Sequence, residues 1–289
     1  MSKLHADFFA DQMVQVTSEL ERNDLIAEST YRLRVAAPEI ASRVVPGQFV
    51  MIRLSGTDQP LIGRALAVWD VIVGDDGAPH WIDLIYLKKG NFTTPCAESP
   101  LGTRVTVWGP LGNGFSISPC SHLIMAVGGI GQTPMLLLGR EAQGAQSFDR
   151  ENGWAENVEL IYGARRESLL AGVPDFEAAG FDIRLCTDDG SIGEQALVPD
   201  VVARRLDELK TEDASIRVVT CGPEIMMEKV ADVCHQRGVA CQVSMETPMA
   251  CGIGICFSCV AKVKQDDGEW DYKRTCVEGP IFDAEKIVF

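Results

Sequence analysis

Four cysteines near the C-terminus are grouped in a way that limits how this part of the chain can fold. Cys251, Cys256 and Cys259 follow the spacing C-x4-C-x2-C in the segment METPMACGIGICFSCVAKV, and Cys276 follows in YKRTCVEGP. Two glycines separate the first two cysteines, and glycine lets the backbone curl where other residues cannot. We therefore expect three thiols on one loop, with Cys276 closing the group from a later strand or turn.

This spacing is the one with which plant-type ferredoxins hold a [2Fe–2S] cluster through four thiolates. A structural zinc ion and simple burial of the thiols are the alternatives. Zinc sites usually combine two short C-x2-4-C units, and here only one unit is that short. Free cysteines are common in cores, but cores rarely group three so closely among glycines. The spacing therefore predicts a cluster, which passes one electron at a time.

The composition is that of an ordinary globular protein. The chain has 289 residues, which suggests two domains or slightly more. Its formal charge of −15 argues against a nucleic-acid ligand, because phosphate binding needs clustered Lys and Arg. The N-terminus lacks the apolar core of a signal peptide, and no apolar run approaches the roughly 20 residues that span a bilayer. Many cysteines without a secretion signal fit a cytoplasmic protein. Most of the scattered cysteines are expected to be buried small apolar residues: Cys96, Cys120, Cys186, Cys221, Cys234 and Cys241.

Hydrophobic periodicity and turn signals divide the chain into three predicted parts. Residues 10–118 contain six short β-rich runs, which suggests a small antiparallel barrel. Residues 119–243 alternate continuous apolar strands with helical stretches near 132–143 and 223–237, which predicts a doubly wound parallel sheet covered on both faces. Residues 244–289 are too short to fold well alone, so a bound cluster should help to organise them.

Three glycine-containing turns follow apolar strands in the second part. They are GGIGQTP (128–134), TDDG (187–190) and TCGP (220–223). Such turns place free N–H groups and a positive helix end at the carboxyl edge of a parallel sheet, where ligands bind. The first turn differs from the common G-x-G-x-x-G fingerprint, and alone it is equally a tight turn that needs φ > 0. Three turns at one edge together predict a nucleotide site.

An arginine pair follows the second strand of this part. Arg165 and Arg166 come directly after Gly163-Ala164, where the adenosine ribose of a dinucleotide often lies. The pair is suited to a 2′-phosphate or to a pyrophosphate, or it is a solvated edge. The sequence leaves NADH and NADPH both open.

The order of the three parts resembles the ferredoxin–NADP reductase superfamily. Two strings bring the chain closer to one branch. Met249–Val260 reads M-A-C-G-I-G-x-C-x-x-C-V, and Tyr272–Ala284 reads Y-K-R-x-C-x-x-G-P-x-F-D-A. Both look like the electron-transfer subunit of NAD-dependent dihydroorotate dehydrogenase. The resemblance extends over nearly the whole chain and includes Gly109–Phe115, although that string is superfamily-wide.

The resemblance implies FAD on the barrel, NAD(H) in the α/β domain and four thiolates on the cluster. Electrons would pass from NADH to the flavin and then singly through the cluster to a catalytic flavoprotein subunit of the dihydroorotate dehydrogenase type, in a hetero-oligomer that serves pyrimidine biosynthesis. Flavin belongs between the two because it handles both electron pairs and single electrons. Cys221 would lie near the hydride path. The implied nucleotide-binding residues are Gly128, Gly129, Gly131, Thr133, Pro134, Gly163, Arg165, Asp189, Gly222, Pro223 and Met226.

The predicted flavin site departs from the superfamily pattern. Where the family has Arg-Pro-x-Ser or Arg-x-Tyr-Ser/Thr, this chain has Arg64-Ala65-Leu66-Ala67. Arg64 suits the flavin pyrophosphate, with a surface salt bridge as its alternative role. Ala67 offers no hydroxyl, and one lost hydrogen bond costs about 0.5–1.5 kcal/mol. We therefore expect weaker flavin binding without requiring its loss. The second flavin segment comprises Lys89, Gly90, Asn91, Thr93 and Thr94.

Two other functions remain open from the sequence. A related reductase subunit with another acceptor, such as a sulfide-type or hydrogenase-type complex, would have the same parts, and the changed flavin motif is compatible with a changed partner. A redox sensor without catalytic activity would hold the cluster but would not oxidise NADH.

Overall fold

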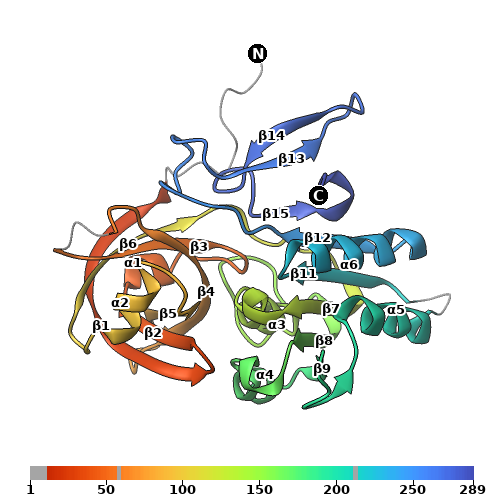
Figure 1. Cartoon of the computed structure of the whole chain (residues 1–289), viewed down its shortest axis with the longest axis horizontal. Coiled ribbons are helices and arrows are strands. Elements are labelled where there is room, and N and C mark those ends of the chain that lie inside the picture. Colours follow the sequence, from red (N-terminus) through yellow and green to blue (C-terminus); the bar gives the residue numbers. More distant parts are fainter. Residues whose placement is uncertain (1–11, 57–59, 211–213) are drawn as a thin grey trace.

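The computed structural model describes residues 12–56, 60–210 and 214–289. It consists of an N-terminal barrel, an α/β sheet and a small C-terminal segment that lies beside both (Figure 1). Within the described ranges, no helix has the length and apolar character needed to cross a membrane.

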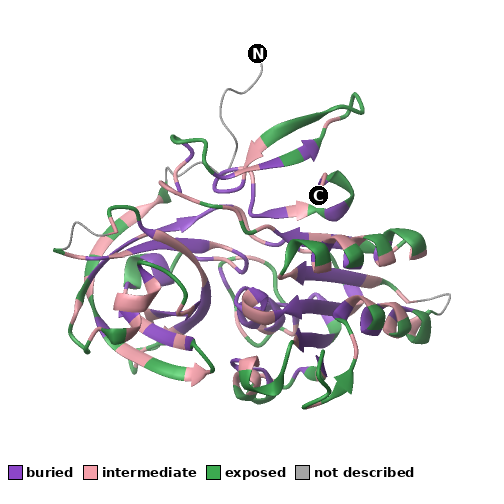
Figure 2. Ribbon diagram, viewed as in Figure 1, coloured by how far each residue is buried: buried purple, intermediate pink, exposed green. Residues whose placement is uncertain are grey.

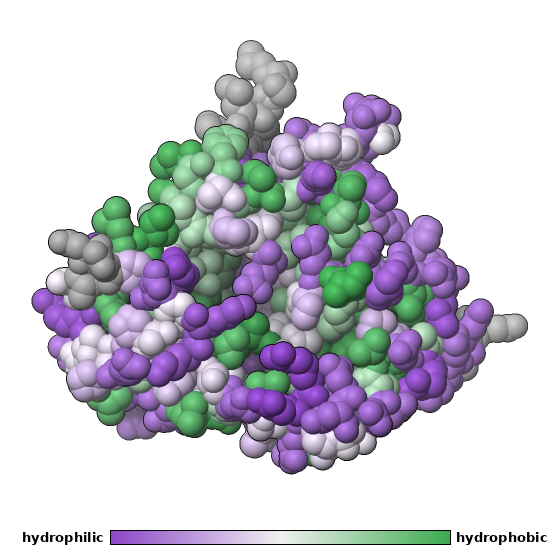
Figure 3. All heavy atoms as spheres, viewed as in Figure 1, coloured by the Kyte–Doolittle hydropathy of each residue, from purple (hydrophilic) through white to green (hydrophobic). Residues whose placement is uncertain are grey.

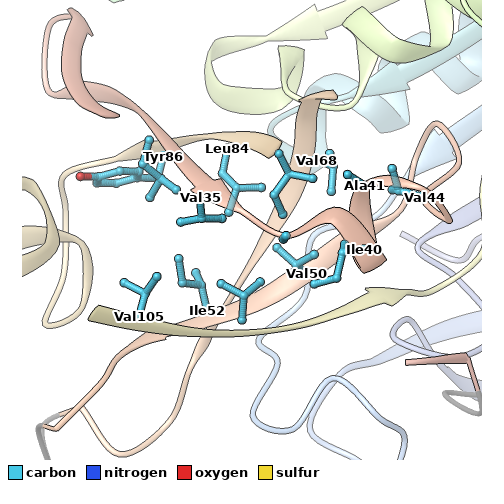
Figure 4. Close-up of a cluster of buried hydrophobic side chains, with 14 of the residues drawn as sticks. Val35, Ile40, Ala41, Val44, Val50, Ile52, Val68, Leu84, Tyr86 and Val105 are labelled. Atoms are coloured by element: carbon cyan, nitrogen blue, oxygen red, sulfur yellow. The ribbon is translucent and has the colours of Figure 1, made fainter. Parts of the chain in front are cut away.

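Six antiparallel strands close the barrel in the order β1-β2-β5-β4-β3-β6, which confirms the predicted architecture. Alternate side chains point inward because successive residues of a strand face opposite sides. Val35, Val50, Ile52 and Leu84 fill the interior, where Figure 4 shows them pointing toward one another. The barrel elements are β1 (Val14–Ala27), β2 (Thr30–Ala36), α1 (Pro38–Ala41), β3 (Phe49–Leu54), β4 (Arg64–Val73), β5 (Pro79–Leu87), α2 (Thr93–Glu98) and β6 (Arg104–Leu111).

The second part is a seven-stranded sheet in the order β10-β9-β8-β7-β11-β12-β15. All neighbouring strands are parallel except β15, which pairs antiparallel with β12. The strands are β7 (Cys120–Gly128), β8 (Ala155–Ala164), β9 (Asp182–Thr187), β10 (Glu194–Gln195), β11 (Ile216–Cys221), β12 (Ala240–Ser244) and β15 (Ile281–Asp283). The helices are η2 (Gly129–Gln132), α3 (Met135–Ala142), η3 (Glu167–Leu169), α4 (Val173–Ala178), α5 (Val198–Leu209) and α6 (Glu224–Arg237).

Helices cover both faces of this sheet, as the continuous apolar strands predict. Leu136 of α3 and Phe176 of α4 belong to the apolar cluster on one face. Val202 of α5 and Val230 of α6 belong to the cluster on the other face. The strands are accordingly buried between helices whose outer sides are exposed (Figure 2). This leaves the carboxyl ends of the strands as the open edge of the sheet.

The C-terminal segment leaves the sheet after β12 and returns to it. It forms a loop, the hairpin β13 (Val260–Lys264) and β14 (Trp270–Arg274), then β15 and η4 (Ala284–Lys286). Asn113, just after the barrel, fixes the return. Its side chain donates to the carbonyl of Ile281 at 2.8 Å and accepts from the N–H of Ile281 at 2.9 Å.

Charged side chains join the barrel to the α/β sheet. The buried guanidinium of Arg32 contacts Asp83 at 2.6 Å within the barrel and Asp175 of α4 at 2.7 Å. Arg140 of α3 contacts Asp70 of β4 at 2.6 Å. Burial raises the pKa of Asp70, while its two arginine neighbours oppose that shift. These pairs fix the orientation of the barrel relative to the open edge of the sheet.

Candidate functional site

The four predicted cluster cysteines lie at the base of the C-terminal segment, three on one loop and Cys276 on the turn after β14. Gly252 and Gly254 have φ angles of +74° and +81°, and Phe257 has +56°. These left-handed positions let the loop wrap around its own interior. The Sγ atoms of Cys259 and Cys276 lie 3.1 Å apart, which brings the turn after β14 against the loop.

Cys259 faces Cys276, and the other two thiols contact their own loop. The Cys256 thiol lies 3.2 Å from the Ser258 hydroxyl, and Cys251 Sγ accepts the N–H of Ile253 at 3.4 Å. A hydrogen bond from Ser258 lowers the pKa of Cys256 to about 7. The contact with Cys276 lowers the pKa of Cys259 to about 6 and raises the pKa of Cys276.

These four thiols are the ligand set that a plant-type [2Fe–2S] cluster would take. Cys251, Cys256 and Cys259 lie on one loop, and Cys276 reaches it from the turn after β14. The lowered pKa values of Cys256 and Cys259 suit metal binding, because the ligand is the thiolate, whereas the raised pKa of Cys276 means that its proton would have to leave as the cluster binds.

The cluster loop packs against the outer face of the barrel. The indole N–H of Trp108 in β6 donates to the carbonyl of Cys251 at 3.1 Å. Gly252 lies so close to β3 that an added Cβ would be 2.6 Å from the Cγ of Met51. Met51 is paired with Ala65 of β4, and all of these side chains share one apolar cluster. The loop is therefore held beside the strand that carries the predicted flavin motif.

The four residues of that motif point in different directions. Ala65 packs with the cluster-loop residues, whereas Leu66 packs with the barrel interior. The half-buried Arg64 donates to the carbonyl of Gly63 at 3.3 Å. Ala67, the next outward-facing residue after Ala65, is only partly buried. Ala65 and Ala67 thus form the outward side of β4, which supplies no side-chain hydroxyl. Arg64 starts the strand on the side of Leu66, because successive side chains face opposite sides.

The second predicted flavin segment begins α2. The hydroxyl of Thr93 accepts the N–H groups of Lys89 at 2.9 Å and Gly90 at 3.0 Å, so it stabilises its own turn. Lys89 and Asn91 are exposed, Thr94 is half-buried, and nothing lies within 4 Å of a Cβ placed at Gly90. The segment therefore retains an accessible cation and open backbone of the kind that a flavin phosphate needs.

A cavity of about 470 Å³ lies at the carboxyl ends of β7, β8 and β11, where the sequence predicts a nucleotide. It is lined by Gly128 and Gly129 of the first turn, by residues that follow β8, and by the start of α6. Thr30 and Leu87 of the barrel complete its wall. The predicted residues that line this cavity are Gly128, Gly129, Gly163, Arg165, Pro223 and Met226.

Other predicted nucleotide residues shape the turns without lining this cavity. A Cβ at Gly131 would lie 2.2 Å from the carbonyl oxygen of Cys221, so only glycine lets the first and third turns meet. Thr133 and Pro134 lead into α3. Gly222 has φ +150° and borders a second cavity of about 340 Å³.

The arginine pair is divided between two environments. Arg166 binds Glu28, in the turn between β1 and β2, and contacts Ser168, so it serves the contact between barrel and sheet. Arg165 lines the cavity.

The acidic turn after β9 is divided in the same way. Asp189 accepts hydrogen bonds from Ser191, which lower the pKa of Asp189, whereas Asp188 lines the cavity.

Known proteins share this architecture. Residues 246–288 match the model of the iron–sulfur cluster binding domain of dihydroorotate dehydrogenase B. The electron transfer subunit of dihydroorotate dehydrogenase B (NAD(+)) from Desulforamulus reducens is 32% identical over 266 residues, which cover 92% of this chain and 95% of that protein. The corresponding subunit from Caldanaerobacter subterraneus is also 32% identical, over 84% of this chain and 87% of its own. The chain belongs to this family of electron transfer subunits.

Solved structures place this family member in a wider fold group. The NADH-dependent reduced ferredoxin–NADP oxidoreductase structure is 26% identical, with a TM-score of 0.76, and the match covers 94% of this chain and 89% of the other. Phthalate dioxygenase reductase matches with a TM-score of 0.58 at 15% identity, which shows the fold alone.

In this electron transfer subunit, burial raises the pKa of the Cys221 thiol to about 12, so the thiol is neutral at ordinary pH. The residue ends β11 directly before Gly222, which lines the second cavity. Five of the remaining scattered cysteines are buried, as predicted: Cys96, Cys120, Cys186, Cys234 and Cys241.

Sequence reasoning missed several residues of the nucleotide cavity. Lys229 and Ile225 lie one turn apart on α6, and Leu197 precedes α5. The spacing of Ile225 and Lys229 behind the TCGP turn was the available signal, because residues four apart share one helix face. Gln132 is buried against the cavity, and neither of its side-chain amide atoms has a hydrogen-bond partner in the described structure.

Proposed function

We propose that this chain passes electrons from NADH through FAD and a [2Fe–2S] cluster to a catalytic flavoprotein subunit of the dihydroorotate dehydrogenase type. It would act in the cytoplasm, as one part of a hetero-oligomer. The observation that carries the proposal is the position of the cysteine loop. Cys259 and Cys276 share an apolar cluster with Ala65 of the predicted flavin motif, and the nucleotide cavity lies at the neighbouring sheet edge.

Each part of the chain has a distinct task in this proposal. FAD would bind residues 10–118, NAD(H) would bind residues 119–243, and residues 244–289 would hold the cluster. Bound flavin supplies the exchange between a hydride pair and single electrons. Arg165 and Lys229 attract the phosphates of the dinucleotide into the first cavity.

The other site residues act through packing and position. Gly131 lets the nucleotide turns meet, and the neutral Cys221 thiol adds no charge beside the hydride path. Arg64 and Lys89 are the cations that would hold the flavin pyrophosphate. Trp108 keeps the cluster loop on the barrel, which shortens the distance that electrons travel.

Two exposed apolar side chains flank Cys256 and would meet the acceptor subunit. Ile255 is 71% exposed and Phe257 is 65% exposed. Figure 3 shows hydrophobic side chains gathered over this part of the surface, beside the barrel. Arg274 lies 5.1 Å from the Phe257 ring and holds it in place. A hydrophobic surface of this kind on an otherwise acidic chain is typical of a protein interface.

The proposal is tested first on the chain alone and then with its acceptor. Without air, NADH should bleach both the flavin and the cluster absorbance of the wild-type chain. The double substitution Ile255→Asp with Phe257→Asp should keep this bleaching but slow reduction of the co-purified catalytic subunit by more than roughly tenfold, because hydrophobic interface anchors dominate binding. Leu25→Asp, which changes an equally exposed leucine on β1, is the matched control.

The outcomes separate the possible functions. A cluster signal that does not respond to NADH would contradict the proposal and favour the redox sensor. Bleaching by NADH without electron transfer to a dihydroorotate dehydrogenase subunit would favour another acceptor. That second function has some structural support, because the ferredoxin–NADP oxidoreductase structure matches 94% of this chain.

A further inference from the structure

Two adjoining cavities at the sheet edge carry opposite charges. The first cavity is bordered by the basic side chains of Arg165 and Lys229, together with Asp188. The second cavity is bordered by Glu224 and Glu246, and none of the described residues that line it is basic. The two cavities share Gly128, Gly129, Ile130 and Pro223, so one extended ligand is able to occupy both.

The two parts of a dinucleotide match the charges of the two cavities. Its phosphates are anionic and suit the first cavity. Its nicotinamide ring is neutral when reduced and carries a positive charge when oxidised. The second cavity combines the apolar side chains of Met227 and Met245 with carboxylates, which is a suitable surface for a flat ring that becomes a cation.

Glu246 is the better placed of the two carboxylates. It follows the end of β12 and directly precedes the cysteine loop, and the N–H of Met245 donates to Pro280 at 2.8 Å, which fixes this stretch of backbone. Its charge also reaches the Cys221 thiol, where it adds to the effect of burial in raising the pKa of Cys221. Glu224 instead begins α6, where the N-terminal N–H groups of the helix partly offset its charge.

We propose that Glu246 is a specificity-determining residue that favours the oxidised, positively charged nicotinamide ring over the neutral ring. This inference rests on the proposed function. Loss of a hydride from the ring carbon removes two electrons and one proton and leaves the ring as a cation; bound flavin would take up the hydride. A carboxylate beside the ring stabilises that developing charge, so it assists hydride release as well as NAD⁺ binding.

The experiment compares two ligands on the chain loaded with FAD and cluster. Calorimetry measures the binding of NAD⁺ and of tetrahydro-NAD, whose ring is neutral and does not donate hydride. Glu246→Gln should weaken NAD⁺ binding about three- to fivefold, as expected for one partly exposed charge pair, and leave tetrahydro-NAD binding unchanged. The difference between the ligands should shrink at high salt, because exposed charges are screened.

Control variants make the result decisive. Glu285→Gln changes an exposed carboxylate of the same segment that lines neither cavity, so both affinities should stay at the wild-type value. Equal weakening of both ligands in Glu246→Gln would overturn the inference, and so would a charge effect found only in Glu224→Gln. If the wild-type chain bound neither dinucleotide, the proposed function itself would be wrong.

Discussion

The nucleotide cavity and the cluster segment are built in opposite ways. The cavity lies at the ends of β7, β8 and β11, whose side chains are buried in two large apolar clusters. The cluster segment has a two-stranded sheet, and two of its few core residues are the ligands Cys259 and Cys276. The first site is therefore formed by the fold before any ligand binds, whereas the second depends on its ligand for much of its stability.

The largest expected effect breaks the second site and leaves the first intact. Cys276→Ser removes the thiolate that faces Cys259. The cluster signal and electron transfer to the acceptor should therefore be lost. Hydrogen exchange should show residues 246–288 losing protection while β7 and β11 keep theirs. Calorimetry should show that NAD⁺ still binds, because no residue of this segment lines the first cavity. Its affinity should fall by about the three- to fivefold expected from the loss of the Glu246 charge.

A thiol outside the site provides the control for this prediction. Cys96→Ala changes a buried cysteine of the barrel and should keep the cluster spectrum. If Cys276→Ser left residues 246–288 as protected as in the wild type, the segment would be stable without its ligand and the contrast between the two sites would fail.

The same contrast explains what the sequence predicts well. The cysteine spacing and the GGIG and TCGP turns are local patterns, and local patterns determine local backbone geometry. The six barrel strands and the covered parallel sheet follow from hydrophobic periodicity, which reports the burial of each face. The structure accordingly has Cys251, Cys256 and Cys259 on one loop with Cys276 against it, and it has the GGIG and TCGP turns at the cavity, while the roles of these residues stay predictions.

Contacts between residues far apart in the chain could not be predicted from the sequence. Trp108 and Cys251 are separated by 143 positions, and Glu28 and Arg166 by 138. No local pattern indicates that Gly252 packs on Met51, or that Arg166 leaves the cavity to Arg165. The location of the flavin residues stays a prediction for the same reason, because the changed motif at Arg64 removes the local signal.

A smaller effect is expected when a side chain is added at the contact between the first and third turns of the nucleotide site. Gly131→Ala would place a Cβ 2.2 Å from the Cys221 carbonyl, so the two turns must separate. We expect a loss of about 1–3 kcal/mol in the free energy of unfolding, as for other overpacked positions. NAD⁺ binding should weaken while the cluster spectrum is unchanged, and urea unfolding with calorimetry measures both.

The control for this substitution is a glycine with free space around it. Nothing lies within 4 Å of a Cβ at Gly90, so Gly90→Ala should leave the free energy of unfolding close to that of the wild type. Equal stability of Gly131→Ala and the wild type would mean that the two turns are not in fixed contact, and the nucleotide site would then not be preformed.

The smallest effect concerns the exposed ion pair between Glu28 and Arg166, which helps to hold the barrel against the sheet. Hydrogen bonds from Ser168 and Arg166 lower the pKa of Glu28 below its usual value of 4.5. An acid with a lowered pKa in the folded state stabilises that state above its unfolded pKa, and this contribution is lost as the pH falls through the folded value. Both partners are largely exposed to solvent, so the contribution is small.

Urea unfolding of the wild type should therefore show a slight loss of stability below about pH 4.5 that Glu28→Gln lacks. Because Arg166 turns away from the cavity to make this contact, Glu28→Gln should affect the seating of the barrel and leave the cluster spectrum unchanged. A stability profile identical to that of the wild type across this pH range would show that the ion pair contributes nothing, and the buried contacts of Arg32 would then account for the seating alone.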